Sequence, residues 1–139
     1  MPDPTTVLFV CVSNRGKSVM AEYLTPTLTD RIAASSAGTT AALGGRVNEL
    51  SAQALAEVGA VVDDHEPRQL TDELMRAADL VVVVGDAEVT APAGVELEVW
   101  ATDEPSRRGI DGIDRMRLIR DDIADRIRDL VDRLDRLDR

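Results

Sequence analysis

The chain contains few of the residues that usually carry redox, metal or stacking chemistry. Its 139 residues include one cysteine, Cys11, one lysine, Lys17, one histidine, His65, and one each of Phe, Trp and Tyr. A single cysteine cannot close an internal disulfide, so redox chemistry would need a thiol from another molecule. A lone histidine without a second Cys or His argues against a zinc site, and no metal is expected.

The chain also lacks long apolar runs and an excess of positive charge. No segment approaches the roughly 18 apolar residues of a membrane span, and residues 1–4 lack the basic start of a secretion signal. The net charge of −10 would repel nucleic acid and anionic membrane surfaces. We therefore expect a cytoplasmic protein whose partners are small molecules or proteins.

Strand-like apolar runs alternate with helical patterns along the whole chain. The runs fall at 7–10, 33–37, 80–84 and 96–100, with helical periodicity at 20–28, 50–58, 73–78 and 116–137 and a charged loop at 101–112. Such alternation predicts one domain, residues 1–139, with a four-stranded parallel sheet between two layers of helices. The last helix is interpreted as a packing helix. Its terminal apolar stripe would suit a partner, but we expect a monomer.

The only cysteine and the only lysine lie within one stretch, Cys11–Ser18, between a strand and a helix. Ligands of such sheets sit at the carboxyl ends of the strands, and a loop there presents backbone amides and a helix N-terminus to an anion. Arg15 and Lys17 add positive charge, which favours a tetrahedral oxyanion and the thiolate form of Cys11. The predicted oxyanion-binding residues are Val12, Ser13, Asn14, Arg15, Gly16, Lys17 and Ser18.

Three residues of this loop have more specific expected roles. Ser18 would donate a hydrogen bond to the Cys11 thiolate. Asn14 suits a left-handed conformation or a bracing amide, and Gly16 suits close backbone approach.

Two other interpretations of the loop remain open. A cysteine at a strand end is often only a small buried hydrophobe. Gly16-Lys17-Ser18 also matches the end of the nucleotide-binding pattern G-x-x-x-x-G-K-[ST], although Cys11 stands at the place of its first glycine.

Cysteine, five residues, a basic residue and serine after an N-terminal strand resemble the low-molecular-weight protein tyrosine phosphatase family and its arsenate reductase relatives. Residues 36–39 (Ser-Ala-Gly-Thr) resemble the second-strand motif of that family. Residues 78–81 (Ala-Asp-Leu-Val) resemble its entry to the third strand, and residues 103–105 (Asp-Glu-Pro) its acid loop. The resemblance implies a family-like α/β/α fold and a cysteine nucleophile.

Three departures from the family pattern bear on the substrate. Lys17 replaces the arginine whose planar fork binds a transferring phosphoryl group. Val84 and Ala91 stand where thioredoxin-linked arsenate reductases carry two further cysteines, so the internal disulfide relay is missing. The acid loop contains no pair of tyrosines of the kind that would wall a phosphotyrosine pocket, and Trp100 is the nearest aromatic residue.

These departures favour the branch that resembles arsenate–mycothiol transferases. In that interpretation Cys11 attacks or orders arsenate, mycothiol forms a thiol–arsenic adduct, and a mycoredoxin-type redoxin reduces the adduct to arsenite. No bound cofactor is implied, and mycothiol is a cosubstrate. A low-molecular-weight phosphatase or phosphomonoester hydrolase is the first alternative, and a non-catalytic oxyanion sensor is the second.

The acid loop would supply the proton for the leaving oxygen. Glu104, directly before Pro105, is preferred as the donor, and Asp103 is the alternative. Arg107 and Arg108 flank the loop and are candidates for contact with the cosubstrate, although surface charge pairing explains them as well. His65 is expected to organise structure.

Overall fold

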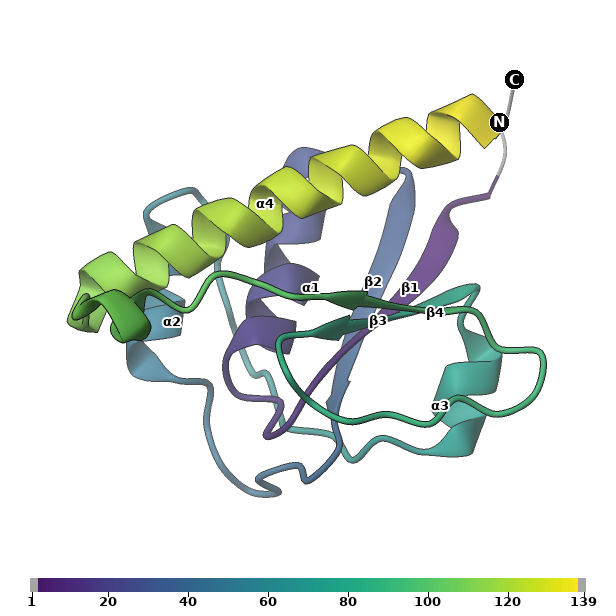
Figure 1. Ribbon diagram of the computed structural model, residues 1–139, viewed down its shortest axis with the longest axis horizontal. Coiled ribbons are helices and arrows are strands. Elements are labelled where there is room, and N and C mark those ends of the chain that lie inside the picture. The colour runs from purple at the N-terminus through teal and green to yellow at the C-terminus, as the bar shows by residue number, and fades with distance from the viewer. Residues whose placement is uncertain (1–2, 138–139) are drawn as a thin grey trace.

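The computed structural model describes residues 3–137. Its centre is one parallel sheet of four strands in the order β2-β1-β3-β4 (Figure 1). The strands are β1 (Thr5–Cys11), β2 (Ile32–Gly38), β3 (Leu80–Val84) and β4 (Leu97–Trp100). The four-stranded parallel sheet expected from the sequence is confirmed.

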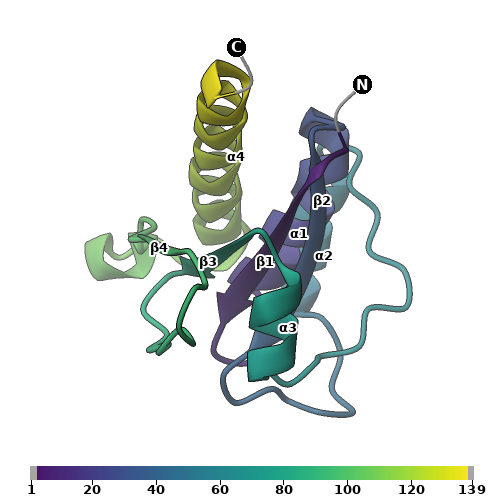
Figure 2. The same cartoon turned by 90° about the vertical axis from the view of Figure 1, so that its right-hand side faces the viewer.

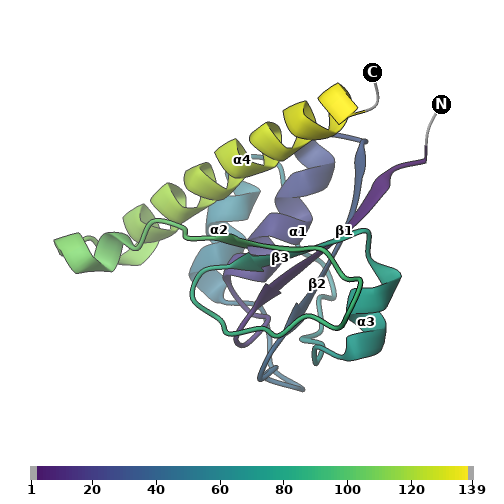
Figure 3. The same ribbon diagram turned by 45° about the vertical axis from the view of Figure 1, so that its right-hand side comes forward.

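Helices cover both faces of this sheet. They are α1 (Lys17–Leu28), α2 (Glu49–Ala56), α3 (Asp72–Ala77) and α4 (Gly112–Leu137), and a 3₁₀ turn, η1, spans Pro105–Arg108. Helices α1, α2 and α4 lie on one face and α3 on the other (Figure 2) (Figure 3). None of the helices within residues 3–137 has the length and apolar character needed to cross a membrane.

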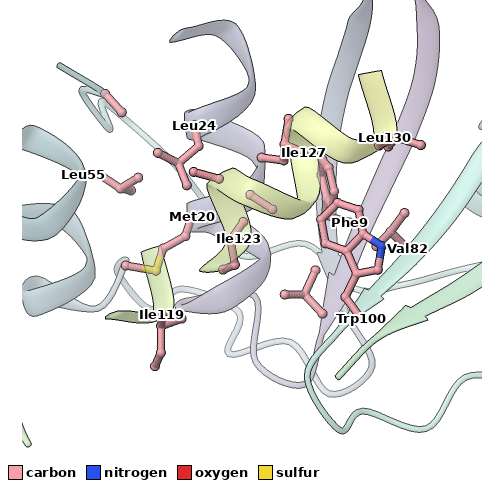
Figure 4. Packing of buried hydrophobic residues seen from close by; sticks show 14 of the residues in the cluster. Phe9, Met20, Leu24, Leu55, Val82, Trp100, Ile119, Ile123, Ile127 and Leu130 are labelled. Atoms are coloured by element: carbon pink, nitrogen blue, oxygen red, sulfur yellow. The ribbon is translucent and has the colours of Figure 1, made fainter. Parts of the chain in front are cut away.

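The strand alternation of β1 divides the core in two. Val7 and Phe9 face the larger cluster, which α1, α2 and α4 complete, whereas Leu8 and Val10 face the smaller cluster under α3. Phe9 packs against Trp100 with ring centroids 5.6 Å apart, beside the isoleucines of α4 (Figure 4). This packing fixes the end of β1 relative to α1 and α4.

The structure differs from the sequence expectations in the periphery. Helix α2 ends at Ala56, and the following turn closes at Gly59, whose φ is 82°. Ala60 N donates to Leu55 O and Gly59 N to Ala56 O, the Schellman pattern of a glycine-terminated helix. The predicted loop 101–112 contains the η1 turn.

Arg120 is a buried charged residue on α4 and does not lie on a solvated face of the helix. Its side chain is buried because Nη1 donates to the carbonyl of Ala54 at 2.9 Å and to Glu57 at 2.8 Å. The apolar stripe of α4 also fades toward its end, where Leu130 is buried and Leu137 is exposed.

The strand order places a crevice beside the end of β1. The chain leaves β1 toward β2 on one side, whereas β3 and β4 lie on the other. This change of direction between β1 and β3 is the usual ligand position in open α/β sheets. The segment from Cys11 to Lys17 enters α1 there, at the lower end of β1 in Figure 1.

Candidate active site

The loop from Cys11 to Gly16 has its carbonyl oxygens engaged away from the crevice. The carbonyls of Cys11, Val12 and Ser13 accept hydrogen bonds from the amides of Thr39, Thr40 and Ala42. Those of Asn14 and Arg15 bind His65 Nε2 at 3.1 Å and the amide of Asn48 at 2.8 Å. Because each peptide is planar, its N–H points opposite to its carbonyl.

This arrangement leaves loop amides available to a ligand. Within residues 3–137, the amides of Ser13, Arg15 and Gly16 donate to no other atom. A row of backbone N–H groups at the start of a helix is suited to a tetrahedral oxyanion. His65 helps to hold the loop, as expected from its lack of metal-binding neighbours.

Gly38, in the Ser-Ala-Gly-Thr segment, lies against the backbone of the Cys11 loop. A Cβ atom at residue 38 would lie 2.5 Å from the carbonyl oxygen of Val12 and 2.9 Å from the amide nitrogen of Asn14. The loop therefore crosses directly over the end of β2, and only glycine permits that approach.

Asn14 is the brace of the loop. It is fully buried and adopts a left-handed conformation with φ of 58°. Its Oδ1 accepts from the amide of Arg68 at 2.9 Å, and its Nδ2 donates to Ser18 Oγ and Ser36 Oγ, both at 2.9 Å. The backbone donor of Arg68 thus fixes which way the Asn14 amide points.

Cys11 lies at the end of this hydrogen-bond chain. Its Sγ is 2.9 Å from Ser18 Oγ and accepts from the amide of Asn14 at 3.3 Å. Because Ser18 Oγ already accepts from Asn14, the Ser18 hydroxyl proton is free to point at sulfur. Two donors at Sγ stabilise a thiolate, the nucleophilic form of cysteine.

A pocket of about 250 Å³ opens above Cys11. Its lining combines the loop with the ends of β3 and β4: Cys11, Val12, Ser13, Gly16, Lys17, Val84, Asp86, Ala87 and Glu104. Lys17 lies along Gly85, where a Cβ would be 3.4 Å from Nζ, and its Nζ is 3.7 Å from Glu104 Oε1. Six of the twelve predicted site residues line this pocket: Cys11, Val12, Ser13, Gly16, Lys17 and Glu104.

Glu104 is clamped by Arg115, a residue that the sequence analysis did not identify. Arg115 Nη2 donates to Oε1 at 2.7 Å and Nε to Oε2 at 2.8 Å. These hydrogen bonds, with a smaller contribution from Ser106, lower the pKa of Glu104 to about 2. Glu104 is therefore ionised at neutral pH in this arrangement, and it would have to take up a proton before donating one.

The other predicted site residues lie outside the Cys11 pocket. Asp103 is half-buried and pairs with Arg108, whose two hydrogen bonds lower the pKa of that carboxyl. The Arg107 side chain borders an adjacent pocket that Lys17, Asp86 and Glu104 also line. Arg15 turns away from the pocket, and its Nε donates to the carbonyl of Arg46 at 2.6 Å.

Asp86 and Arg115 are lining or supporting residues that the sequence analysis missed. Asp86 lies two residues after the end of β3, so its place at the carboxyl edge of the sheet was a usable signal. Arg115 had no such signal, because it lies on a helix in which arginine recurs on every face.

None of the three aromatic residues lines the Cys11 pocket. Phe9 and Trp100 are buried in the core, and Trp100 Nε1 donates to Glu98 at 2.7 Å. Tyr23 stacks edge-on against His65, with ring centroids 5.8 Å apart. The pocket walls are therefore polar and aliphatic.

Gly38→Ala should displace the loop. Because the added methyl would meet two backbone atoms, we expect the free energy of unfolding to fall by about 2 kcal/mol and oxyanion affinity to fall about tenfold. Thermal unfolding and calorimetric titration with arsenate measure these effects. Gly59→Ala, strained by a positive φ but meeting no atom, is the control, and it should lower stability alone. Unchanged arsenate affinity in Gly38→Ala would contradict this account.

Arg115→Met should raise the pKa of Glu104 from about 2 toward the ordinary value near 4.5. With Arg115 present, this carboxylate stabilises the fold above about pH 4.5, and that contribution is lost as the pH falls toward 2. Carboxyl NMR titration of the variant measures the shift. Arg133→Met, which removes the partner of Glu98, should leave Glu104 unshifted. An unchanged titration in Arg115→Met would show that the clamp does not set the pKa.

A family model and a similar curated protein both relate this chain to one family. Residues 6–139 match the family model for low molecular weight phosphotyrosine protein phosphatase. A putative arsenate reductase of Halobacterium salinarum is 30% identical over an alignment of 138 residues that covers 94% of each chain.

Two solved structures extend the likeness to three dimensions. The crystal structure of an arsenate reductase from Archaeoglobus fulgidus has a TM-score of 0.73 and 32% identity, covering 90% of this chain and 98% of that one. A thioredoxin-dependent arsenate reductase of Corynebacterium glutamicum has a TM-score of 0.75 and 29% identity, covering 100% of this chain and 66% of that one. The chain therefore belongs to the low molecular weight phosphotyrosine protein phosphatase family.

Proposed function

We propose that the protein is an arsenate reductase that passes arsenate from Cys11 to a low-molecular-weight thiol. The observation that carries the proposal is a Cys11 thiol supported by two donors beneath a loop of free amides, in a chain with no second cysteine. Relatives named arsenate reductase, aligned over most of both chains, support the choice of oxyanion.

The first step is substitution at arsenic. The Cys11 thiolate forms a bond to arsenic, and one hydroxyl of arsenate leaves with a proton as water. The loop amides and Lys17 hold the remaining oxygens and their negative charge. Ser18, which stabilises the Cys11 thiolate before attack, does the same when Cys11 becomes the leaving group.

The second sulfur has to come from outside the chain. A low-molecular-weight thiol forms a bond to arsenic as the bond from Cys11 breaks, and the proton of that thiol goes to solvent. A redoxin thiolate then attacks the sulfur of the adduct. The sulfur–arsenic electron pair passes to arsenic, so arsenite leaves and two sulfurs are oxidised to a disulfide.

Mycothiol is the proposed thiol, and a mycoredoxin-type protein is the proposed redoxin. We propose that the enzyme is a monomer and that the reaction takes place in the cytoplasm. The need for an external thiol rests on the missing relay: Val84 is buried at the end of β3, and Ala91 lies in the following loop, with no sulfur at either position. The choice of mycothiol rests on the resemblance to arsenate–mycothiol transferases. No bound cofactor enters the scheme.

Glu104 and Lys17 have different roles in this scheme. Glu104 lines the pocket and Asp103 does not, so Glu104 remains the proposed proton donor to the departing hydroxyl. It would act after a shift of the acid loop separates it from Arg115. Lys17 supplies a positive charge without the planar fork that suits a transferring phosphoryl group.

Phosphomonoester hydrolysis is the second candidate function. The observation that favours it is the loop itself, whose amides suit phosphate as well as arsenate. The polar and aliphatic pocket walls argue against a phosphotyrosine substrate, because they offer no aromatic face to its ring.

The experiment that tests the proposal measures arsenite release from arsenate, mycothiol and a mycoredoxin. We expect release by the wild-type protein and a loss of at least about a thousandfold in Cys11→Ser, because the hydroxyl is a far weaker nucleophile and leaving group. An aryl phosphate serves as the parallel substrate. Turnover of the phosphate without arsenite would replace the proposal with the hydrolase, and arsenate binding without either reaction would favour an oxyanion sensor.

Lys17→Arg separates the two enzyme functions. We expect it to raise aryl phosphate turnover about tenfold or more, because a guanidinium binds two equatorial oxygens at once. Arsenite release should change less. Steady-state kinetics with both substrates provides the measurement, and Arg76→Gln on the exposed surface of α3 is the control. A variant with no gain in phosphatase activity would show that Lys17 does not set the preference.

A further inference from the structure

A second pocket adjoins the loop on the side of α2 and α4, and the scheme above gives it no role. This α2–α4 pocket has a volume of about 200 Å³ and shares Ser13, Gly16 and Lys17 with the Cys11 pocket. Its other lining residues are Arg15, Met20, Asn48, Ser51, Arg115, Met116 and Ile119. Only the loop separates a molecule bound there from an oxyanion above Cys11.

The lining of the α2–α4 pocket has two chemical parts. Met20, Met116 and Ile119 are buried in the core and give an apolar floor. Arg15, Lys17 and Arg115 place three cationic side chains around it. Lys17 and Arg115 both pair with Glu104. Within residues 3–137, none of the three cations forms an ion pair with another carboxylate. A chain of net charge −10 thus has a local excess of positive charge beside its nucleophile.

Several donors at this pocket have no acceptor among the described residues. Arg15 uses only Nε, on the carbonyl of Arg46, so both of its terminal nitrogens are free. Arg115 uses Nε and Nη2 on Glu104, and its Nη1 is free. Asn48 accepts the amide of Ser51 through Oδ1, which leaves Nδ2 as a donor. The pocket therefore suits a ligand rich in acceptor oxygens.

We propose that the α2–α4 pocket binds the body of the low-molecular-weight thiol cosubstrate. Carboxylate, amide or hydroxyl oxygens of the thiol would accept from Arg15, Asn48 and Arg115, while its methylene groups rest on the apolar floor. The sulfur then reaches arsenic across Gly16 and Lys17. This inference rests on the proposed function. The volume is below the roughly 300–1,000 Å³ of sites for drug-sized ligands, so it fits one part of a small thiol.

The opposite side of the Cys11 pocket is less suitable for the thiol. The adjacent pocket at Arg107 measures about 180 Å³ and is lined by two carboxylates, Asp86 and Glu104. They oppose the charge of Arg107 and Lys17 and would repel an acceptor-rich or anionic ligand. Arg108 is occupied by Asp103. We therefore place the thiol cosubstrate at Arg15 and Arg115 rather than at Arg107 and Arg108, the two candidates named from the sequence.

The test measures the KM of the thiol and the KM of arsenate in arsenite release, with mycothiol and glutathione in separate series. Arg15→Gln removes the guanidinium, and we expect the KM of the thiol to rise about tenfold with the KM of arsenate unchanged within about twofold. Asn48→Asp keeps the cap acceptor of α2 but replaces a donor with a charge. It should also raise the KM of the thiol, more for the carboxylates of glutathione than for the sugar hydroxyls of mycothiol.

Arg76→Gln is the matched control and should change neither KM. If Arg107→Gln raises the KM of the thiol and Arg15→Gln does not, the thiol binds on the acid-loop side and the inference is overturned. Unchanged values in both Arg15→Gln and Asn48→Asp overturn it as well. A wild-type protein that releases arsenite with neither thiol contradicts the proposed function, and the inference falls with it. Wild-type turnover with unaltered variants contradicts the pocket assignment alone.

Discussion

The site depends on the orientation of a few peptide groups after β1. The carbonyls of Cys11, Val12 and Ser13 accept hydrogen bonds from the segment that follows β2. Contacts outside the pocket therefore set the orientation of these peptide groups. Gly38 permits this because it has no side chain between the loop and the sheet. An oxyanion loop built in this way is already organised before a ligand arrives, and its amides need little rearrangement on binding.

Buried hydrogen bonds also fix the position of the Cys11 side chain relative to the loop. Asn14 connects the amide of Arg68 to Ser18, and Ser18 contacts the sulfur of Cys11. Each member of this chain is buried or bound to backbone, and fully satisfied networks of this kind specify one geometry. On the opposite wall, the clamp of Arg115 on Glu104 places a carboxylate next to Lys17. The pocket therefore has one rigid wall of amides and one wall made by an ion-pair cluster.

The sequence was sufficient for the sheet, because an uninterrupted apolar run rich in valine, such as Leu80–Val84, is typical of a buried parallel strand. It was also sufficient for the loop, whose chemistry is concentrated between Cys11 and Ser18. The partners of those residues were harder to foresee. Arg115 reaches Glu104 only because the first turn of α4 lies beside η1, and the burial of Arg120 depends on where α2 stops. Such long-range contacts leave no local pattern.

The lack of a second cysteine makes the origin of the second sulfur the central question about this protein. Cys11 lies at the start of a loop whose free amides suit an oxyanion, yet the chain has no second sulfhydryl that could release the product. The most direct measurement supplies purified protein with arsenate and either thioredoxin with its reductase alone, or a small thiol with its redoxin. The account predicts arsenite only in the second case, with a rate that rises with thiol concentration. Full turnover with thioredoxin alone would contradict it.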